Sequence, residues 1–357
     1  MSTIAIPALY RSLHEYLVHS IPDACDSRLT NLIMLMMGMF QARSVQLNLV
    51  ARKVPIRAKK LSIVRRFERF LKNSAVRVRD WYHPFAVSVL QAAAVGGQVR
   101  LIVDASKVSH GHRLLMVSVA YQRRSLPIAW TWVRSSRGHS STAKQVKLLD
   151  YVYRLLPSGM KVSLVGDCEF DHPLLIENLS FWGWDYALRQ PSHHLVMTHD
   201  TNAWQRLDSL GLVPGTSCWL GHVLLTQASP YPTHLVLHWQ RGQKQPWFLA
   251  TNVLCPQVAL KLYRLRMWIE EMFGDLKKHG FDLESTHFRH ILRLSRLTLT
   301  VCLLYLWLVA LGQHVLAHGL AAQVDRTDRR DLSIFRLGWD FLEDCLRLFD
   351  PIPSVSF

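Results

Sequence analysis

The chain of 357 residues is poor in cysteine, and its six cysteines are widely scattered. No two of them form a CxxC pair, which excludes a cysteine zinc knuckle, and their spacing indicates no disulfide framework. A reducing, cytoplasmic compartment is therefore expected. The first ten residues also lack a basic segment followed by an apolar one, which argues against a secretory signal.

Acidic residues are scarce as well. The chain has 26 Asp and Glu against 42 Lys and Arg, and its formal net charge is +16. Such an excess favours a polyanionic partner, because each cation set against a phosphate releases a condensed counterion. Nucleic acid is the first candidate and an anionic membrane surface the second. The 49% of hydrophobic residues exclude a disordered tail and predict a folded core.

One long apolar run, residues 297–317, contains no acidic or basic residue except His314. It is long enough to span a bilayer. It also holds Thr298, Thr300 and Gln313, and no second run accompanies it. These features favour a buried core helix over a membrane span.

The first 95 residues show helical periodicity and a basic polar side. The cations of this region are Arg43, Arg52, Lys53, Arg57, Lys59, Lys60, Arg65, Arg66, Arg69, Lys72, Arg77 and Arg79. Short helices with a basic face are typical of helix-turn-helix-like DNA-binding domains. The alternative is a solvated helical surface without a ligand.

The pattern changes at residue 98. Apolar runs predict strands over 98–106, 113–122, 125–133, 161–167 and 184–188. Helices are predicted over 83–94, 142–156, 173–181, 258–278, 288–317 and 333–349. Residues 190–251, rich in Pro, Gly, Ser, Thr and Trp, are predicted to form a β-rich insertion. Together these elements predict a mixed α/β sheet.

Two acids, Asp104 and Asp167, stand directly at the ends of predicted apolar strands. Strand ends are where open α/β sheets place their chemistry. A carboxylate there must be solvated, paired or bound to a metal. For either acid alone, a helix N-cap or a turn is an equally good interpretation.

A polar stripe strengthens the case for a site. Tyr263, Arg266, Glu270 and Lys277 are separated by three, four and seven residues, which keeps them on one side of a predicted helix. A salt-bridged surface helix is the alternative. The apolar residues between them indicate instead a mostly buried helix whose polar stripe faces a site. Glu271, about 100° round the helix, does not share the stripe.

This spacing resembles the Y-R-E-K signature of bacterial insertion-sequence transposases, in the hairpin-forming cut-and-paste group called the insertion sequence 4 family. The resemblance covers about residues 98–310. It implies an RNase H-like core over 96–320 that contains the insertion 190–251. An all-α DNA-binding domain would precede it over 1–95, and a C-terminal helical segment would follow over 321–357. "DAS" after Asp104 and "DCE" after Asp167 depart from the usual variants without removing a ligand.

The resemblance implies that Asp104, Asp167 and Glu270 are the catalytic residues. As DDE carboxylates they would hold two Mg²⁺ ions, with Mn²⁺ as a substitute, for phosphodiester cleavage and strand transfer.

The resemblance also assigns Tyr263, Arg266 and Lys277 to DNA phosphates. Trp247 matches the place of an aromatic ring that stacks on a flipped base at the hairpin stage. Packing within the insertion itself explains Trp247 equally well, and Trp239 and Trp219 match less closely.

The expected partners are double-stranded DNA, as terminal inverted repeats and target, and a second copy of the chain in the DNA complex. No membrane and no small-molecule cofactor are expected, and the protein is expected at the bacterial nucleoid. Three alternatives stay open: an inactive, domesticated DNA-binding protein, a nuclease that does not transpose, and a membrane-surface protein.

Overall fold

The computed structural model describes residues 5–21, 24–108, 110–134 and 139–357. The start of the N-terminal stretch on which the absence of a secretory signal was judged lies outside these ranges. Five helices come first in the described chain: α1 (Ala5–Val18), α2 (Asp26–Ala42), α3 (Leu47–Val50), α4 (Lys60–Lys72) and α5 (Val78–Ala94). The expected helical character of this region is confirmed.

The start predicted for the helix over 83–94 is wrong. Helix α5 begins at Val78 and carries Pro84 in its interior. Pro84 removes one backbone donor, which normally disfavours a helix interior. Trp81 and Phe85 are buried against the neighbouring elements, and burial of such large side chains offsets the lost hydrogen bond.

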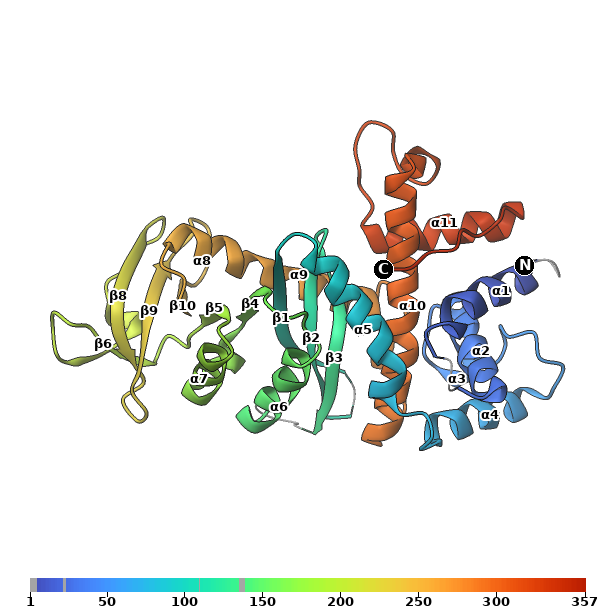
Figure 1. Ribbon diagram of the computed structural model, residues 1–357, viewed down its shortest axis with the longest axis horizontal. Helices are drawn as coiled ribbons and strands as arrows, with labels where there is room; N and C mark the ends of the chain where they lie inside the picture. The colour runs from blue at the N-terminus through green and yellow to red at the C-terminus, as the bar shows by residue number, and fades with distance from the viewer. Residues whose placement is uncertain (1–4, 22–23, 109, 135–138) are drawn as a thin grey trace.

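A ten-stranded mixed sheet extends from the left end of the molecule to its middle in Figure 1, and helices alone lie to its right. Its first strands are β1 (Gln98–Lys107), β2 (His112–Tyr121), β3 (Arg124–Arg134), β4 (Lys161–Gly166) and β5 (Asp185–Arg189). Helices α6 (Thr142–Tyr153) and α7 (Pro173–Phe181) connect them. The antiparallel strands β1, β2 and β3 form a meander, and β4 and β5 extend it in parallel with β1. The order β3-β2-β1-β4-β5 confirms the expected RNase H-like core.

The register of the two central parallel strands determines where the acids meet. Val103 on β1 pairs with Gly166 on β4. The residues that follow these two are Asp104 and Asp167. Parallel strands end at the same edge of a sheet, so the two carboxylates emerge side by side.

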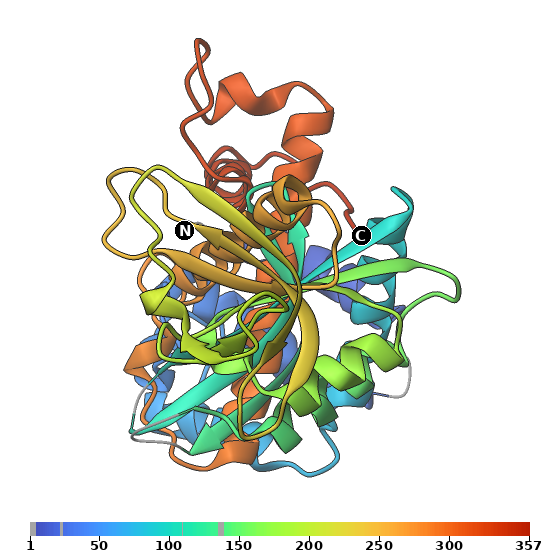
Figure 2. The same cartoon turned by 90° about the vertical axis from the view of Figure 1, so that its left-hand side faces the viewer.

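Residues 190–251 form short strands that continue the same sheet. These are β6 (Leu195–Met197), β7 (Trp204–Arg206), β8 (Ser217–Leu225), β9 (Tyr231–His238) and β10 (Trp247–Thr251). Strand β10 pairs antiparallel with β5 and joins the segment to the core. Seen from this end, its strands cross those of the core steeply (Figure 2), as expected for a long twisted sheet.

The prediction of one continuous helix over 258–278 is wrong. The chain forms α8 (Pro256–Tyr263), a 3₁₀ turn (Arg264–Arg266) and α9 (Met267–Leu276). The backbone stays in the right-handed helical region through the turn, so the direction of the chain is kept while the winding tightens. The predicted stripe therefore crosses a junction between two helices.

The apolar run lies in α10 (Ile291–Ala317), the long vertical helix of Figure 1. By length and composition it is the one helix of the described chain that could cross a membrane, and 94% of its apolar window is buried inside the protein. The prediction of a core helix is confirmed. Helix α11 (Ile334–Leu348) crosses it at Gly312 and Gly338, where backbone touches backbone.

Candidate active site

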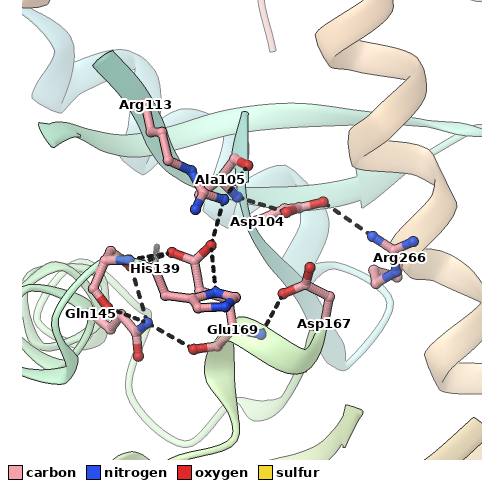
Figure 3. Close-up of polar contacts among 9 residues, drawn as sticks. Asp104, Ala105, Arg113, His139, Gln145, Asp167, Glu169 and Arg266 are labelled. Carbon is pink, nitrogen blue, oxygen red and sulfur yellow. Dashed lines mark hydrogen bonds and ion pairs between the residues drawn. The ribbon is translucent and has the colours of Figure 1, made fainter. Parts of the chain in front are cut away.

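Two carboxylates lie where the pairing between β1 and β4 ends (Figure 3). Asp104 lies on β1 and is only 8% exposed, and the backbone N–H of Ala105 donates to its Oδ1 at 2.7 Å. Asp167 follows β4 and caps a short 3₁₀ turn, where the N–H of Glu169 donates to its Oδ1 at 2.9 Å. Backbone donors thus fix one oxygen of each acid.

The third acid reaches the site from α9. Glu270 lies in the first turn of that helix, with a side chain that is 44% exposed. Arg266 lies between Glu270 and Asp104. Its Nη2 donates to Glu270 Oε1 at 2.6 Å, and its Nη1 donates to Asp104 Oδ2 at 3.2 Å. One guanidinium therefore connects two of the three acids.

All three acids line one open cavity of about 550 Å³. Its walls come from the ends of β1, β4 and β5 and from one side of α9. The lining residues are Asp104, Ala105, Ser106, Lys107, Asp167, Cys168, Arg189, Arg266, Glu270, Phe273, Gly274 and Lys277. The cavity is open, and most of its lining residues are polar or charged.

Burial and charge act together on Asp104. Burial, followed by repulsion from Asp167, raises the pKa of Asp104 from 3.8 to about 7, and Arg266 opposes this rise. Burial also raises the pKa of the Cys168 thiol to about 11, which keeps this neighbour protonated and unreactive at neutral pH. Burial, more than repulsion between the two acids, therefore disfavours the ionised form of Asp104.

The arrangement suits hard divalent cations, although the described residues contain no group of three His, Cys, Asp or Glu placed together as a ready metal site. Glu270 is turned toward Arg266 and toward solvent. Asp104 and Asp167 offer carboxylate oxygens, which Mg²⁺ and Mn²⁺ prefer. A cation bound beside Asp104 would offset the two causes that raise the pKa of this carboxyl, its burial and the repulsion from Asp167.

Two other residues of the predicted stripe lie differently. Lys277 lines the cavity just beyond the end of α9, and its Nζ donates to the carbonyl of Lys107 at 2.6 Å and pairs with Glu284 at 2.8 Å. Tyr263 is 3% exposed and does not line the cavity. Its ring lies edge-on to Trp247, with centroids 5.0 Å apart, and burial raises its pKa to about 12.

Glu271, the rival for the third acid, lies outside the cavity. Its carboxylate is 3.4 Å from Arg124 and its side chain is 53% exposed. Trp247 is half-buried between His238 and Tyr263. This position agrees with packing inside the sheet region and leaves part of the ring accessible.

Four of the basic residues of the N-terminal region, Lys59, Lys60, Arg65 and Arg66, lie at α4. Lys59, Lys60 and Arg65 are exposed at or near the start of that helix. Arg66 is half-buried, and its Nε donates to Asn31 Oδ1 on α2 at 2.5 Å. The first three present free charge to solvent, whereas Arg66 joins two helices.

The sequence prediction omitted Arg189, which closes the cavity from the end of β5. Its Nη2 donates to the carbonyl of Pro246 at 3.2 Å, and it has no carboxylate partner within the described ranges. Its position directly after the predicted strand 184–188 was the available signal, because Asp167 also directly follows a strand. Glu169 and Arg113, beside the acids, were omitted as well.

Comparisons with known proteins identify a family and a similar solved structure. Residues 96–307 match the family model described as "Transposase DDE domain". A solved structure that is similar is a piggyBac transposase synaptic complex with hairpin DNA, determined by cryo-electron microscopy. The similarity has a TM-score of 0.45 at 10% sequence identity and covers 98% of this chain and 82% of that chain. No curated protein matches the sequence.

Proposed function

The chain belongs to the transposase DDE domain family, and from this premise we propose that it is an insertion-sequence DNA transposase with Asp104, Asp167 and Glu270 as its catalytic carboxylates. The observation that carries the proposal is the single cavity that these three acids line. They come from β1, from the turn after β4 and from α9, in the chain order that a DDE site requires.

We propose that Asp104 and Asp167, with Glu270 once it leaves Arg266, hold divalent cations, Mg²⁺ with Mn²⁺ as a substitute. Bound cations would supply activation of a hydroxyl nucleophile and neutralise charge that develops on the phosphate. The chain's own part is to orient the oxygens. The N–H groups of Ala105 and Glu169 fix one oxygen of each Asp, and the other oxygen of Asp104 accepts from Arg266 until that guanidinium moves away.

The cations of the cavity support binding of a DNA strand. Arg266 offers a planar donor pair suited to a phosphate, and Lys277 offers a point charge at the opposite end of α9. Arg189 adds a guanidinium that no carboxylate within the described ranges neutralises. We propose that these three hold phosphates on either side of the cut.

Terminal inverted repeats are the proposed ligand of the N-terminal helices. Lys59, Lys60 and Arg65 lie on the exposed side of α4 and would contact phosphates. Arg66, held by Asn31, would support the helix pair instead. We also propose that cleavage proceeds through hairpin formation, in which a base stacks on Trp247 with Tyr263 nearby. A dimer of the chain would bring the two DNA ends together.

The test is a cleavage reaction on linear DNA that carries the terminal inverted repeats of the chain's own element, with Mg²⁺ or Mn²⁺. Hairpin-ended products from the wild type, lost in Asp104→Ala and kept in the exposed control Asp200→Ala, support the proposal. Specific binding without cleavage at every metal concentration contradicts it. That outcome favours the alternative of an inactive DNA-binding protein derived from a transposase.

A further inference from the structure

A buried carboxylate that the proposed chemistry does not use lies beside the catalytic acids. The side chain of Glu169 is 2% exposed, although it stands only two residues after Asp167. A buried charge is retained at low energy only when it is paired and hydrogen-bonded. Glu169 satisfies both conditions through three neighbours that come from two separate segments of the chain.

The first neighbour is Arg113 at the start of β2. Its Nη2 lies 2.6 Å from Glu169 Oε2 and also donates to the carbonyl of Ala105 at 3.1 Å. Ala105 follows Asp104 directly, and Glu169 donates its own N–H to Asp167. Arg113 thus connects the residue after one catalytic acid to the residue that holds the other.

The remaining neighbours come from the segment before α6. Ser140 donates to Glu169 Oε1 through its N–H at 2.7 Å and through its hydroxyl at 2.6 Å, and the His139 Nδ1 lies 3.5 Å from Oε2. Gln145, 1% exposed on α6, donates to the carbonyl of Glu169 and to the hydroxyl of Ser140, both at 3.0 Å. The backbone and the side chain of Glu169 are therefore both fixed by hydrogen bonds.

The orientation of Glu169 separates it from the proposed ligands. Figure 3 shows its carboxylate directed toward Arg113 and His139, whereas Asp167 lies on the side of Asp104 and Arg266. Glu169 does not line the catalytic cavity. It contacts the site indirectly, through the backbone of Ala105 and its own N–H group, which orient Asp104 and Asp167.

We propose that Glu169, through its ion pair with Arg113, is a positioning residue that sets the separation and direction of Asp104 and Asp167 for divalent cations; this inference rests on the proposed function. Partners behind metal ligands commonly determine metal affinity in this way. The Glu169 charge also neutralises Arg113, so that this guanidinium does not compete with a cation for the acids.

The test is Glu169→Gln, which keeps the size of the side chain and its hydrogen bond from Ser140 but removes the charge facing Arg113. Mn²⁺ binding to the DNA-free protein is measured by electron paramagnetic resonance, and cleavage of terminal-repeat DNA in a single turnover. The affinity for Mn²⁺ is expected to fall about 10-fold or more. Affinity for the DNA in EDTA is expected to stay unchanged. Glu177→Gln, exposed on α7, is the matched control.

Wild-type protein that neither binds Mn²⁺ nor cleaves DNA contradicts the proposed function itself. Wild-type protein that does both, with Glu169→Gln unchanged in Mn²⁺ affinity, overturns the positioning role alone, even when the variant melts earlier. Ser140→Ala covers the case in which Glu169→Gln fails to fold. It removes one hydrogen bond to Glu169 and keeps Arg113, so a smaller loss of Mn²⁺ affinity is expected, and no loss overturns the inference.

Discussion

The guanidinium of Arg266 lies 2.6 Å from the carboxylate of Glu270, one helical turn further along the chain. The same guanidinium reaches Asp104 at 3.2 Å. It therefore supplies positive charge to two acids that a divalent cation would otherwise have to neutralise. Binding of cations and of a DNA phosphate both require Arg266 to exchange these partners.

Replacing Arg266 should distinguish a specific role of its guanidinium in catalysis from the contribution of its positive charge alone. Arg266→Gln is expected to slow cleavage about 100-fold, because a charged donor aimed at the reacting phosphate is lost. Arg264→Gln, an exposed arginine in the same turn, should stay near the wild-type rate. Single-turnover cleavage under saturating Mg²⁺ measures both. Equal rates for the two variants would show that Arg266 contributes only bulk charge.

The raised pKa of Asp104 makes stability depend on pH. Between about pH 4 and pH 7 the folded protein keeps a proton on Asp104 that the unfolded chain has released. The stability of the metal-free protein therefore falls as pH rises through this window, by up to about 1.4 kcal/mol per pH unit from this group. It follows that Asp104→Asn melts at a higher temperature than the wild type at pH 8 in EDTA.

Thermal melts of both proteins in EDTA at pH 4 and pH 8 check this expectation. The difference in Tm should vanish at pH 4, where Asp104 is protonated when folded. Mn²⁺ at pH 8 should raise the Tm of the wild type more than that of Asp104→Asn. A wild type that is more stable than the variant at pH 8 without metal would contradict the raised pKa of Asp104. The exposed Asp200→Asn serves as control.

A second buried pair holds α9 against the sheet. Arg124 Nε, at the start of β3, lies 2.8 Å from Asp275 Oδ2, and both side chains are largely buried. Arg124→Ala leaves a buried carboxylate unpaired, so a loss of about 3 kcal/mol in unfolding free energy is expected at pH 8. Arg100→Ala, exposed on β1, should have little effect. Urea unfolding compares the two, and similar losses would mean that the pair does not anchor α9.

The crossing of α10 and α11 depends on two glycines. A methyl group on Gly338 would collide with the carbonyl of Leu308, and one on Gly312 with that of Ile334. Gly338→Ala is therefore expected to destabilise the protein by at least about 2 kcal/mol, through overpacking. Gly96→Ala, which meets open space, is the control. An unchanged Tm for Gly338→Ala would mean that the helices separate without cost.

Much of the architecture could be predicted from periodicity alone. The end of β4 just before Asp167 follows from an apolar run that stops at an acid, and the buried nature of α10 follows from its isolated apolar run with scattered polar residues. The prediction that β1 ends at Asp104 is wrong, because β1 continues to Lys107 in its pairing with β2. Predictions from local sequence patterns failed where tertiary packing determines the bounds of a helix. Pro84 lies inside α5 because its neighbours are buried, and the tightened turn at Arg264–Arg266 has no proline or glycine to announce it.

Contacts between residues far apart in the chain could not be predicted from local sequence patterns. The spacing from Tyr263 to Lys277 placed four polar residues on one stripe, yet Tyr263 is buried under Trp247 and outside the cavity. The Glu169–Arg113 pair joins residues 56 positions apart, so no local spacing indicates it. Arg189 becomes a cavity residue only through the sheet order that sets β5 beside β4.

The central claim is that Glu270, with Asp104 and Asp167, forms the catalytic set. The most direct measurement compares Glu270→Gln with its neighbour Glu271→Gln in single-turnover cleavage of terminal-repeat DNA with Mg²⁺. Glu270→Gln should lose at least about 100-fold in rate, whereas Glu271→Gln, directed at Arg124 outside the cavity, should remain within about 3-fold of the wild type. Cleavage that survives in Glu270→Gln, or that is lost equally in both variants, would contradict the account.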